Sequence, residues 1–339
     1  MDKKTLSMSL ILSTIVGSNL WALPAKAADL LVGSFNTNSV LRYNGLKGNF
    51  IDDFIPSSSG GLNGPVAITF GEDRNLYLIS IFNHSILRYD GTTGAFIDDF
   101  VSSGSGGLFL PQDLTFGPDG NLYVSSTGTD QVLRYDGQSG ELIDEFVTEN
   151  SGGIDAPFGV RFGEDGNFYV SSTFTNEILR YDGQTGEFLD IFASGLELDG
   201  PGGITFGPDG NLYVANFTSN SDPVFLKRTI TRHDGKTGEL IDIFINNLDG
   251  RLNGGPVQPI FGPDGNLYVS VRDDNTVLRY DGQSGEFIDE FIQDGSGGLS
   301  TAGWLAFRSV DEPSSGKGLL ALVAIGGMGM MVKRIRNAQ

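Results

Sequence analysis

The sequence contains no cysteine and only two histidines, His84 and His233, in 339 residues. Without cysteine, the chain cannot form disulfide bonds or thiolate metal sites. Two histidines exclude most zinc sites and most catalysis that depends on imidazole groups. Helical periodicity is also missing between the two ends of the chain, so β-structure is the main expectation for the body.

Basic residues are few: 22 Lys and Arg stand against 42 Asp and Glu, which gives a net charge of −20. Residues 1–27 and 311–339 are each net positive, so the body between them is more acidic than the whole chain. Such a body repels nucleic acid and anionic lipid. We therefore predict no nucleic-acid partner and interpret the acidity as an aid to solubility outside the cytoplasm.

Residues 1–27 have the layout of a secretory signal peptide. Two lysines near the start precede an apolar stretch over about residues 6–23, and an Ala-x-Ala cleavage pattern follows at Ala25 and Ala27. Cleavage there would start the mature chain at Ala28 or nearby. The sequence thus predicts export to the periplasm, the cell surface or the exterior.

A second apolar run, GLLALVAIGGMGMMV, covers residues 318–332 and is followed by three basic residues. As a helix it would be about 22 Å long, shorter than the ~30 Å hydrocarbon core of a bilayer. The basic side chains that follow can extend to the membrane surface, so a short transmembrane helix is feasible. We predict membrane anchoring by residues 310–339, through either a processing signal or a plain C-terminal anchor.

Directly before this run stands VDEPSSGKG, which begins at Val310. The order of short motif, apolar helix and basic tail resembles the PEP-CTERM sorting signal of Gram-negative bacteria, whose motif is typically Val-Pro-Glu-Pro. Val310, Glu312 and Pro313 match it, whereas Asp311 replaces its first proline. The resemblance implies export, transient membrane anchoring and cleavage near the motif by an exosortase-type processing peptidase.

The body between these ends repeats itself. FGPDGNLYV begins at Phe116, Phe206 and Phe261, with close variants at Phe70 and Phe162. A second phrase, typified by VLRYDG, recurs six times at spacings of 46 or 47 residues, with one spacing of 52. Self-similarity at this period is typical of propellers, solenoids and arrays.

Each repeat has the pattern of four short β-strands. Runs such as DLTF, LYVSS, VLRY and LIDEF are rich in β-forming residues. The Pro-Asp-Gly and Asp-Gly-Gln-Ser-Gly segments between them are turn signals. Four strands in a repeat of this length are typical of one propeller blade.

Counting the phrases predicts how the ring closes. The VLRY half occurs six times, but the half that should precede it is missing before the first copy. The missing strand reappears at the other end as GWLAFRS, residues 303–309. We therefore predict an all-β, six-bladed β-propeller of four-stranded blades over residues 28–309, closed by this C-terminal strand within the N-terminal blade.

Two details of the repeat are expected to be structural. Arg134 and Asp144, with their equivalents in other blades, should form ion pairs across neighbouring strands near the outer edge. The Asp-Gly turns are interpreted as tight turns in which asparagine would serve equally well, so Asp119→Asn is expected to change stability little.

The repeat resembles the NHL-repeat family of six-bladed propellers. The matching features are a proline before the first strand, as at Pro65 and Pro111, the Gly-Asn-Leu-Tyr-Val turn and strand, and the Leu-Arg-Tyr third strand. Seven-bladed streptogramin lyases have similar repeats, but this chain has six copies. Lyase and amidating enzymes with related folds rely on several histidines, which this chain lacks.

Binding is expected on the face that carries the loops between second and third strands and the crossings between blades, because these segments vary while the other turns repeat. The candidate residues on these loops are Phe82, His84, Asp130, Phe174, Arg272, Asp273, Asp274 and Asn275. Blade 5 adds an insertion with Phe217, Phe225, Lys227 and Arg228, which is either a partner contact or a tolerated surface insertion. His233 replaces the tyrosine of the Leu-Arg-Tyr phrase and is interpreted as a strand substitution.

These observations leave three functions open. The first is a non-catalytic propeller that binds a protein, glycan or small ligand at the cell surface or in the exopolysaccharide matrix. The second is a calcium-dependent lactonase or hydrolase of the gluconolactonase type, which requires converging side chains such as Asp130, Asp155, Asp273, Asp274 and Asn275. The third, by resemblance to exported NHL propellers, is an accessory role in pigment biosynthesis of the scytonemin type.

No catalytic residue and no cofactor are assigned. The acidic turns resemble calcium loops only loosely, because they lack the alternating Asp spacing of such loops. A hairpin turn explains their Asp-Gly pairs sufficiently, so calcium stays a secondary expectation.

Overall fold

The structure is a computed structural model that describes residues 28–217 and 228–309. Three groups of predicted functional residues lie outside this range. They are the signal cleavage residues Ala25 and Ala27, the insertion residues Phe225 and Lys227, and the sorting motif of Val310, Asp311, Glu312 and Pro313.

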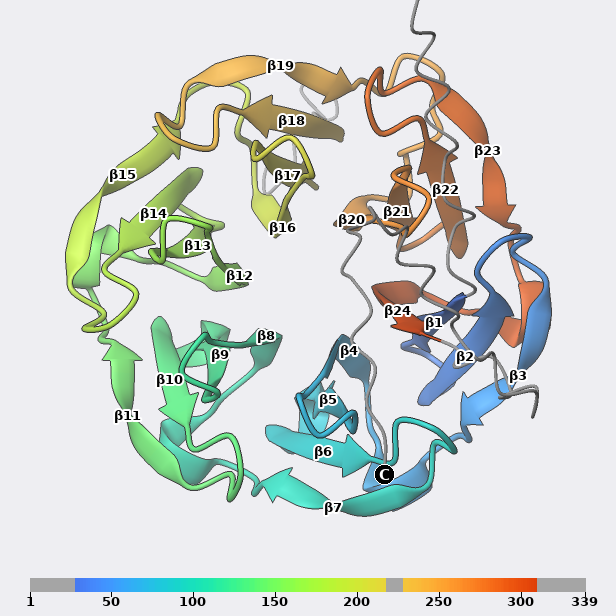
Figure 1. Cartoon of the computed structure of the whole chain (residues 1–339), viewed down its shortest axis with the longest axis horizontal. Helices are drawn as coiled ribbons and strands as arrows, with labels where there is room; N and C mark the ends of the chain where they lie inside the picture. The colour runs from blue at the N-terminus through green and yellow to red at the C-terminus, as the bar shows by residue number, and fades with distance from the viewer. Residues whose placement is uncertain (1–27, 218–227, 310–339) are drawn as a thin grey trace, which may run out of the picture.

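Six four-stranded antiparallel sheets stand as blades around a central axis (Figure 1). Blade 1 consists of β24 (Ala302–Ser309), β1 (Ala28–Ser34), β2 (Ser39–Asn44) and β3 (Phe50–Ile55). Blade 2 consists of β4 (Pro65–Phe70), β5 (Leu76–Ser80), β6 (Ser85–Tyr89) and β7 (Phe96–Val101). Blade 3 consists of β8 (Pro111–Phe116), β9 (Leu122–Ser126), β10 (Gln131–Tyr135) and β11 (Leu142–Val147).

The second half of the ring follows the same plan. Blade 4 consists of β12 (Pro157–Phe162), β13 (Phe168–Ser172), β14 (Glu177–Tyr181) and β15 (Phe188–Ser194). Blade 5 consists of β16 (Pro201–Phe206), β17 (Leu212–Asn216), β18 (Thr229–His233) and β19 (Leu240–Ile245). Blade 6 consists of β20 (Pro256–Phe261), β21 (Leu267–Val271), β22 (Thr276–Tyr280) and β23 (Phe287–Ile292). We call the four strands of each blade a to d, from the channel outward.

Short 3₁₀ turns occupy two kinds of loop. Those in the crossings from strand d to the next strand a are η1 (Ser59–Gly61), η3 (Ser105–Gly107), η5 (Ser151–Gly153) and η6 (Ser296–Gly298). Those in the b–c loops are η2 (Ile81–Asn83) and η4 (Thr127–Thr129).

The predicted closure is confirmed. The C-terminal β24 is strand a of blade 1 and pairs with the N-terminal β1, with Leu30 opposite Phe307 and Val32 opposite Leu305. Phe307 packs on Tyr268 of blade 6 at a centroid distance of 5.0 Å, as Phe261 packs on Tyr213 at 5.0 Å. The two ends of the described chain therefore hold each other in one sheet, which removes the open seam of the ring.

The repeated Tyr of strand b joins neighbouring blades. Tyr123 contacts Phe146 of its own strand d at 4.8 Å and Phe162 of the next strand a at 4.9 Å, both edge to face. Such aromatic pairs add about 0.5–1.5 kcal/mol each to the burial of their area. The same pair of contacts recurs at Tyr77 and Tyr169. The tyrosine of the repeated FGPDGNLYV phrase therefore packs its own blade against the next.

The predicted ion pairs are confirmed in all six blades. The Arg134 Nε donates to Asp144 Oδ1 at 3.0 Å, and a second guanidinium nitrogen bonds the other oxygen. The Arg134 guanidinium also lies 5.2 Å from the ring centroid of Phe146. The equivalent pairs are Arg42–Asp52, Arg88–Asp98, Arg180–Asp190, Arg232–Asp242 and Arg279–Asp289.

Asp119 in the a–b turn does more than shape the turn. Its carboxylate accepts hydrogen bonds from the Asn121 backbone N–H (3.1 Å), the Asn121 side chain (2.8 Å) and the Tyr123 hydroxyl (3.0 Å). Burial alone would raise the pKa of Asp119, but these donors and the Arg134 charge lower it. An asparagine would present an NH₂ group to one of these donors, so the expectation that asparagine is neutral here is revised.

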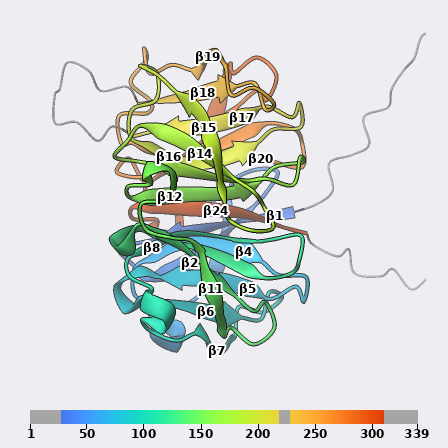
Figure 2. The ribbon, with the colours of Figure 1, turned by 90° about the vertical axis from the view of Figure 1, so that its left-hand side faces the viewer.

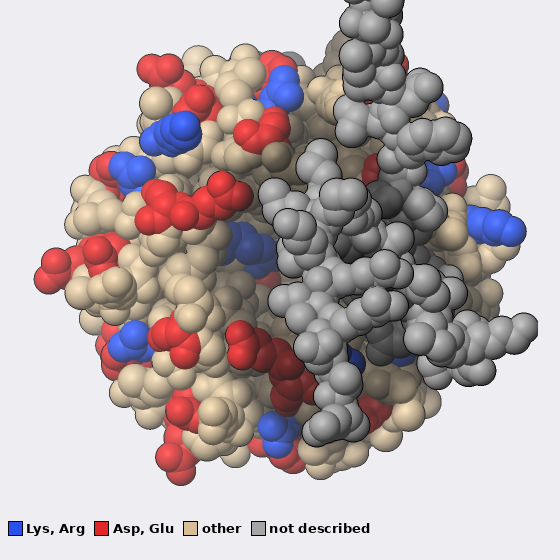
Figure 3. Space-filling model, viewed as in Figure 1, with Lys and Arg blue, Asp and Glu red and all other residues tan. Residues whose placement is uncertain are grey.

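The two faces of the ring differ (Figure 2). The b–c loops hydrogen-bond to the d–a crossings on one face, as where Ile81 N–H donates to Gly64. The a–b and c–d turns, the start of β1 and the end of β24 lie on the other face, which Figure 3 shows with acidic side chains spread among basic ones. Within the described residues, no helix is long and apolar enough to cross a membrane.

Candidate ligand-binding cleft at the mouth of the channel

The floor of the cleft is Trp304, which lies on β24 and is 1% exposed. Its indole Nε1–H donates to the Gln112 carbonyl of blade 3 at 2.7 Å, so the side chain spans from blade 1 toward the opposite side of the channel. In blade 5, a Cβ on Gly203 would come within 2.7 Å of the indole ring. The missing side chain at Gly203 therefore leaves space for the tryptophan, which blocks the channel below the b–c loop face.

Above Trp304, two hollows open on the b–c loop face, with cavity volumes of about 340 and 260 Å³. They share Phe35, Phe158, Val257, Arg272 and Thr301 in their walls, so we treat them as one surface, the mouth cleft. The first hollow adds Asn36, Phe217, Arg228 and Asp273, and the second adds Val66, Phe82, Gln112 and Trp304.

Aromatic side chains form most of the walls and support one another. Phe158 lies 5.5 Å from Trp304 and 5.3 Å from Phe217, measured between ring centroids. On the other side, Phe35 meets Phe82 edge to face at 5.5 Å. Because each ring is held by another, the cleft offers fixed apolar faces to a ligand.

Two guanidinium groups border these rings. Arg272 lies 5.6 Å from the ring centroid of Phe35, a cation–π arrangement that helps to orient its side chain. Arg228 lines the same hollow, and its buried Nε–H has no hydrogen-bond acceptor among the described residues. Of the residues that the structure describes, Asp273 is the one acid in the lining of the two hollows, so the two arginines leave the mouth cleft with a net positive charge in a chain of net charge −20, which favours anions.

Three predicted site residues prove to have a structural task. His84, Asp130 and Asn275 each stand fourth in a b–c loop with φ of 52–53°. Their side chains accept backbone N–H groups of the following crossing at 3.1, 2.8 and 2.5 Å, respectively. Asn38 and Asn176 do the same in blades 1 and 4. Aligning the five loops by repeat would have shown this, because histidine, aspartate and asparagine all tolerate left-handed backbone.

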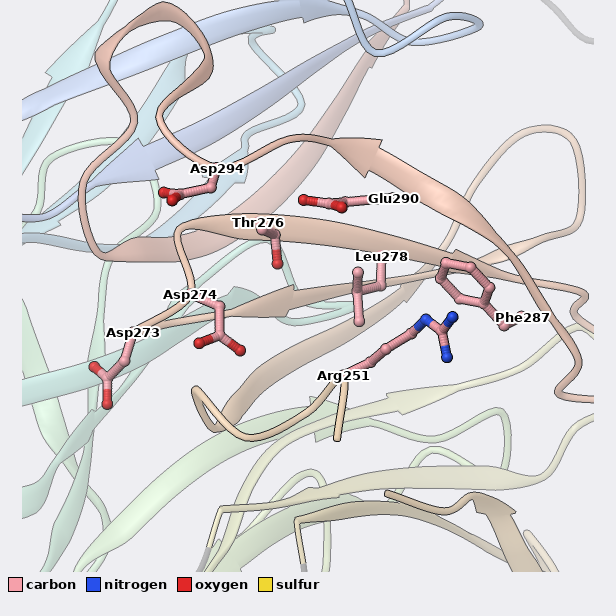
Figure 4. A pocket seen from close by; sticks show the side chains of 8 residues that line it. All are labelled: Arg251, Asp273, Asp274, Thr276, Leu278, Phe287, Glu290 and Asp294. Atoms are coloured by element: carbon pink, nitrogen blue, oxygen red, sulfur yellow. The ribbon is translucent and has the colours of Figure 1, made fainter. Parts of the chain in front are cut away.

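The acidic residues of blade 6 lie on an outer groove instead of converging on one point (Figure 4). Asp274 accepts the Gly254 N–H at 2.9 Å, and Asp294 accepts the Asn275 side-chain amide at 2.9 Å. Asp273 points away from these carboxylates in Figure 4. Among the described residues, no group of three or more acidic or histidine side chains is placed to hold a metal ion.

The remaining predictions divide between the cleft and the surface. Phe82, Phe217, Arg228, Arg272 and Asp273 line the mouth cleft. Phe174 is 66% exposed and does not line it, and Asp155 is an exposed residue of the blade 3 crossing. His233 is buried in β18 between Gly238 and Thr231, as expected for a strand substitution.

Sequence reasoning missed one cleft residue of a b–c loop, Phe35, which directly follows β1. It also missed the cleft residues on strand a, which are Phe158, Val257 and Trp304. For Phe158 and Val257 the signal was present, because the residue after each strand a proline varies from blade to blade among Val66, Gln112, Phe158, Gly202 and Val257. Only the ring geometry shows that this position faces the channel mouth.

Asp113, also on strand a, is a buried charge with a structural role. It is 2% exposed, bonds the Arg161 guanidinium at 2.6 Å and accepts the Val160 N–H at 3.0 Å. Burial raises the pKa of Asp113, while Arg161 and the amides of Val160 and Leu114 oppose this. Gln258, at the same repeat position in blade 6, accepts the Leu305 N–H at 2.6 Å. The side chain at this position can therefore hydrogen-bond strand a of one blade to strand a of the next.

Comparison with known proteins supports the fold. No protein-family model and no curated protein sequence match the chain. A chain of a nidogen/laminin complex aligns with a TM-score of 0.62 and 14% identity, over 83% of this chain and 98% of its own length. A protein of unknown function from Bacteroides caccae aligns with a TM-score of 0.60 and 14% identity, over 83% and 99%.

A virginiamycin B lyase from Staphylococcus aureus aligns less closely, with a TM-score of 0.48 and 18% identity over 74% of this chain and 71% of its own. The two alignments with TM-scores of 0.62 and 0.60, both at 14% identity, show a shared propeller fold alone. The resemblance to NHL repeats stays a prediction.

Proposed function

We propose that this chain is an exported, non-catalytic β-propeller that binds a ligand in the mouth cleft. The observation that carries the proposal is the position of Arg272 and Arg228 at the edge of a rigid aromatic pocket whose floor is Trp304. Aromatic faces pack against rings and apolar groups, while guanidinium groups bind carboxylates, sulfates and phosphates. The proposed ligand is therefore a small molecule or glycan end that carries an anionic group beside a ring.

The loop chemistry favours binding over catalysis. A general base or metal ligand needs a side chain that is directed at the substrate. Instead, His84, Asp130 and Asn275 accept backbone N–H groups between blades. The alternative of a calcium-dependent lactonase draws on the same residues, so this geometry does not favour it.

The place of action follows from the two ends of the sequence. The signal-like N-terminus and the PEP-CTERM-like C-terminus support export, transient anchoring and processing by an exosortase-type peptidase. The acidic body suits the periplasm, the cell surface or an exopolysaccharide matrix. A polysaccharide with acidic sugars would present the anionic ring that the mouth cleft is proposed to recognise.

Trp304 offers a direct test. Trp21 and Trp304 are the two tryptophans of the chain, so a Trp21→Phe chain reports through Trp304 alone. We would titrate this chain with aromatic carboxylates, uronic acid oligosaccharides and neutral oligosaccharides. Anionic ring compounds should change the Trp304 emission saturably, and neutral sugars should bind more weakly.

The variant Arg272→Gln should weaken binding about tenfold, the equivalent of ~1.4 kcal/mol, with unchanged thermal stability. Arg251→Gln is the control, because this arginine lies 3.9 Å from the ring centroid of Phe287 and outside the mouth cleft. A chain that gives no saturable change with any of these compounds, or that hydrolyses a lactone when calcium is added, would contradict the proposal.

A further inference from the structure

The outer strands of blades 4 and 5 depart from the repeat at one outward position. In blades 1, 2, 3 and 6 the fourth residue of strand d is an exposed acid. These acids are Asp53, Asp99, Glu145 and Glu290. In blades 4 and 5 the same position holds Ile191 and Ile243, which are 48% and 41% exposed.

A second departure follows five residues later in the same two blades. The other blades have small or polar residues there, namely Ser58, Gly104, Asn150 and Gly295. Blades 4 and 5 have Leu196 and Leu248, which are 88% and 92% exposed. An acid and a small or polar residue are thus both replaced by large aliphatic residues in two neighbouring blades.

These residues enlarge an apolar surface that is already present. Leu189 and Ile241 are exposed two residues before the isoleucines, on the same face of each strand. β15 and β19 follow one another around the perimeter (Figure 1). Together these side chains expose several hundred Å² of apolar area, which approaches the ~800 Å² that each partner of a stable interface contributes.

β15 and β19 are also the outermost strands of their sheets, so one edge of each has no strand partner among the described residues. Such edges can pair with another strand, and outward charges are a common protection against this pairing. In a two-fold antiparallel pairing, the acids of blades 1, 2, 3 and 6 would approach like charges of the second copy, which is destabilising. Isoleucines at this position would pack instead.

We propose that the outer sector of blades 4 and 5, formed by Leu189, Ile191, Ile241, Ile243 and Leu248, is the surface through which two copies of this chain associate edge to edge. The net negative charge of the chain favours a second copy as the partner of this sector. A basic partner would gain more from the blades with an acid at the fourth position of strand d than from this sector, where Asp190 and Asp242 are already paired with arginines. An identical acidic copy gains most where isoleucine replaces the acid at this fourth position.

The lack of native cysteine permits a test on the full chain. Ser194 and Ser102 are exposed and hold the same repeat position: Ser194 is the last residue of β15 in blade 4, and Ser102 directly follows β7 in blade 2. Single Ser194→Cys and Ser102→Cys chains would be oxidised under identical mild conditions. The yield of disulfide-linked dimer would be read by non-reducing electrophoresis.

Ser194→Cys should give several-fold more dimer than Ser102→Cys, and more in high salt, because salt screens the repulsion between the acidic bodies. Adding Ile191→Asp and Ile243→Asp to the Ser194→Cys chain should reduce the yield to that of Ser102→Cys. The control substitution Ile97→Asp, at an equally exposed apolar position of blade 2, should leave it unchanged. Equal dimer yields from the two cysteine positions would overturn the proposal. A dimer yield that Ile191→Asp and Ile243→Asp do not change would also overturn it, and the sector would then have to bind something other than a second copy of this chain.

Discussion

Four of the six blade junctions close with the same contact, and two do not. Where blade 1 meets blade 2, the Tyr89 hydroxyl of strand c donates to the Ser59 carbonyl in the preceding crossing at 2.8 Å. The equivalent donors Tyr43, Tyr135 and Tyr181 bond serine carbonyls of their preceding crossings at 2.7–2.9 Å. The crossings after blades 4 and 5 are both described, and they contain no Ser-Gly-Gly turn.

The tyrosine changes together with its partner. Blade 5 has His233 in place of the tyrosine, and the Tyr280 hydroxyl of blade 6 has no hydrogen-bond partner among the described residues. The four aliphatic residues that depart from the repeat, Ile191, Leu196, Ile243 and Leu248, lie in blades 4 and 5, and the two arginines of the mouth cleft lie in blades 5 and 6. The comparison teaches that identical residues hold the ring, whereas both surfaces proposed for binding include residues that break the repeat.

The largest loss of stability is expected from a deletion that completely opens one of the four regular blade junctions. Deleting residues 303–309 removes most of β24, leaves β1 without its inner neighbour and removes Trp304. Because the two ends of the chain then no longer share a sheet, we expect the cooperative thermal transition to be lost in circular dichroism. A chain that ends at Ser309 is the control and should melt cooperatively. Cooperative melting of the deletion at the temperature of the control would show that β24 does not hold the ring.

A smaller loss is expected from Asp119→Asn, which acts within the repeated scaffold. The substitution removes acceptors for the Tyr123 hydroxyl and Asn121, so we expect about 1.5 kcal/mol of destabilisation, limited because the carboxylate is partly exposed. Asp136→Asn is the matched control, since Asn44 makes the same turn bonds in blade 1 as Asp136 does in blade 3. Urea unfolding of both variants measures the difference, and equal stabilities would refute the role given to Asp119.

Removing one junction hydroxyl should cost less. Tyr135→Phe deletes the hydrogen bond to Ser105 and should lower the free energy of unfolding by about 1 kcal/mol. Tyr280→Phe, at an irregular junction, should have almost no effect. If both variants lose the same stability in urea unfolding, the two kinds of junction do not differ in the way described.

The smallest effect is a pH dependence at His233. Burial lowers the pKa of His233, while its hydrogen bond to Gly238 opposes this. The unfolded chain then binds the proton more readily, so stability is full above the ordinary histidine pKa of about 6.5 and falls as the pH drops toward the folded pKa. His233→Tyr should abolish this loss between pH 7.5 and 5.5 in thermal melts. An unchanged slope in the variant would assign the loss to other groups.

Most of the fold follows from the repeat itself. The phrases around Phe116 and Arg134 recur often enough to define the strands, and the missing first strand predicts closure by residues 303–309. The Arg134–Asp144 pair could be predicted because the two residues keep a fixed spacing in every blade. Local pattern is sufficient for these features because each blade is built from the same short-range contacts.

The site was only partly predictable. Phe82, Phe217 and Arg272 were found because they stand out in variable loops. His84 and Asp130 stand out equally, yet they hold the crossings, since the loop pattern does not reveal which side chains face the channel. Trp304 was missed because it faces the channel from a strand, and its neighbours Gln112 and Gly203 come from blades far apart in the sequence.

The most direct test of the central claim, that repeated residues hold the ring while the exceptions bind, is one paired measurement. In the Trp21→Phe chain, the melting temperature and the affinity for an anionic ring compound reported by Trp304 would be determined for Asp119→Asn and for Arg272→Gln. We predict that Asp119→Asn lowers the melting temperature and keeps the affinity, whereas Arg272→Gln keeps the melting temperature and loses about tenfold in affinity, ~1.4 kcal/mol. A folded Asp119→Asn chain that has lost affinity, or an Arg272→Gln chain that melts early and binds normally, would contradict the account.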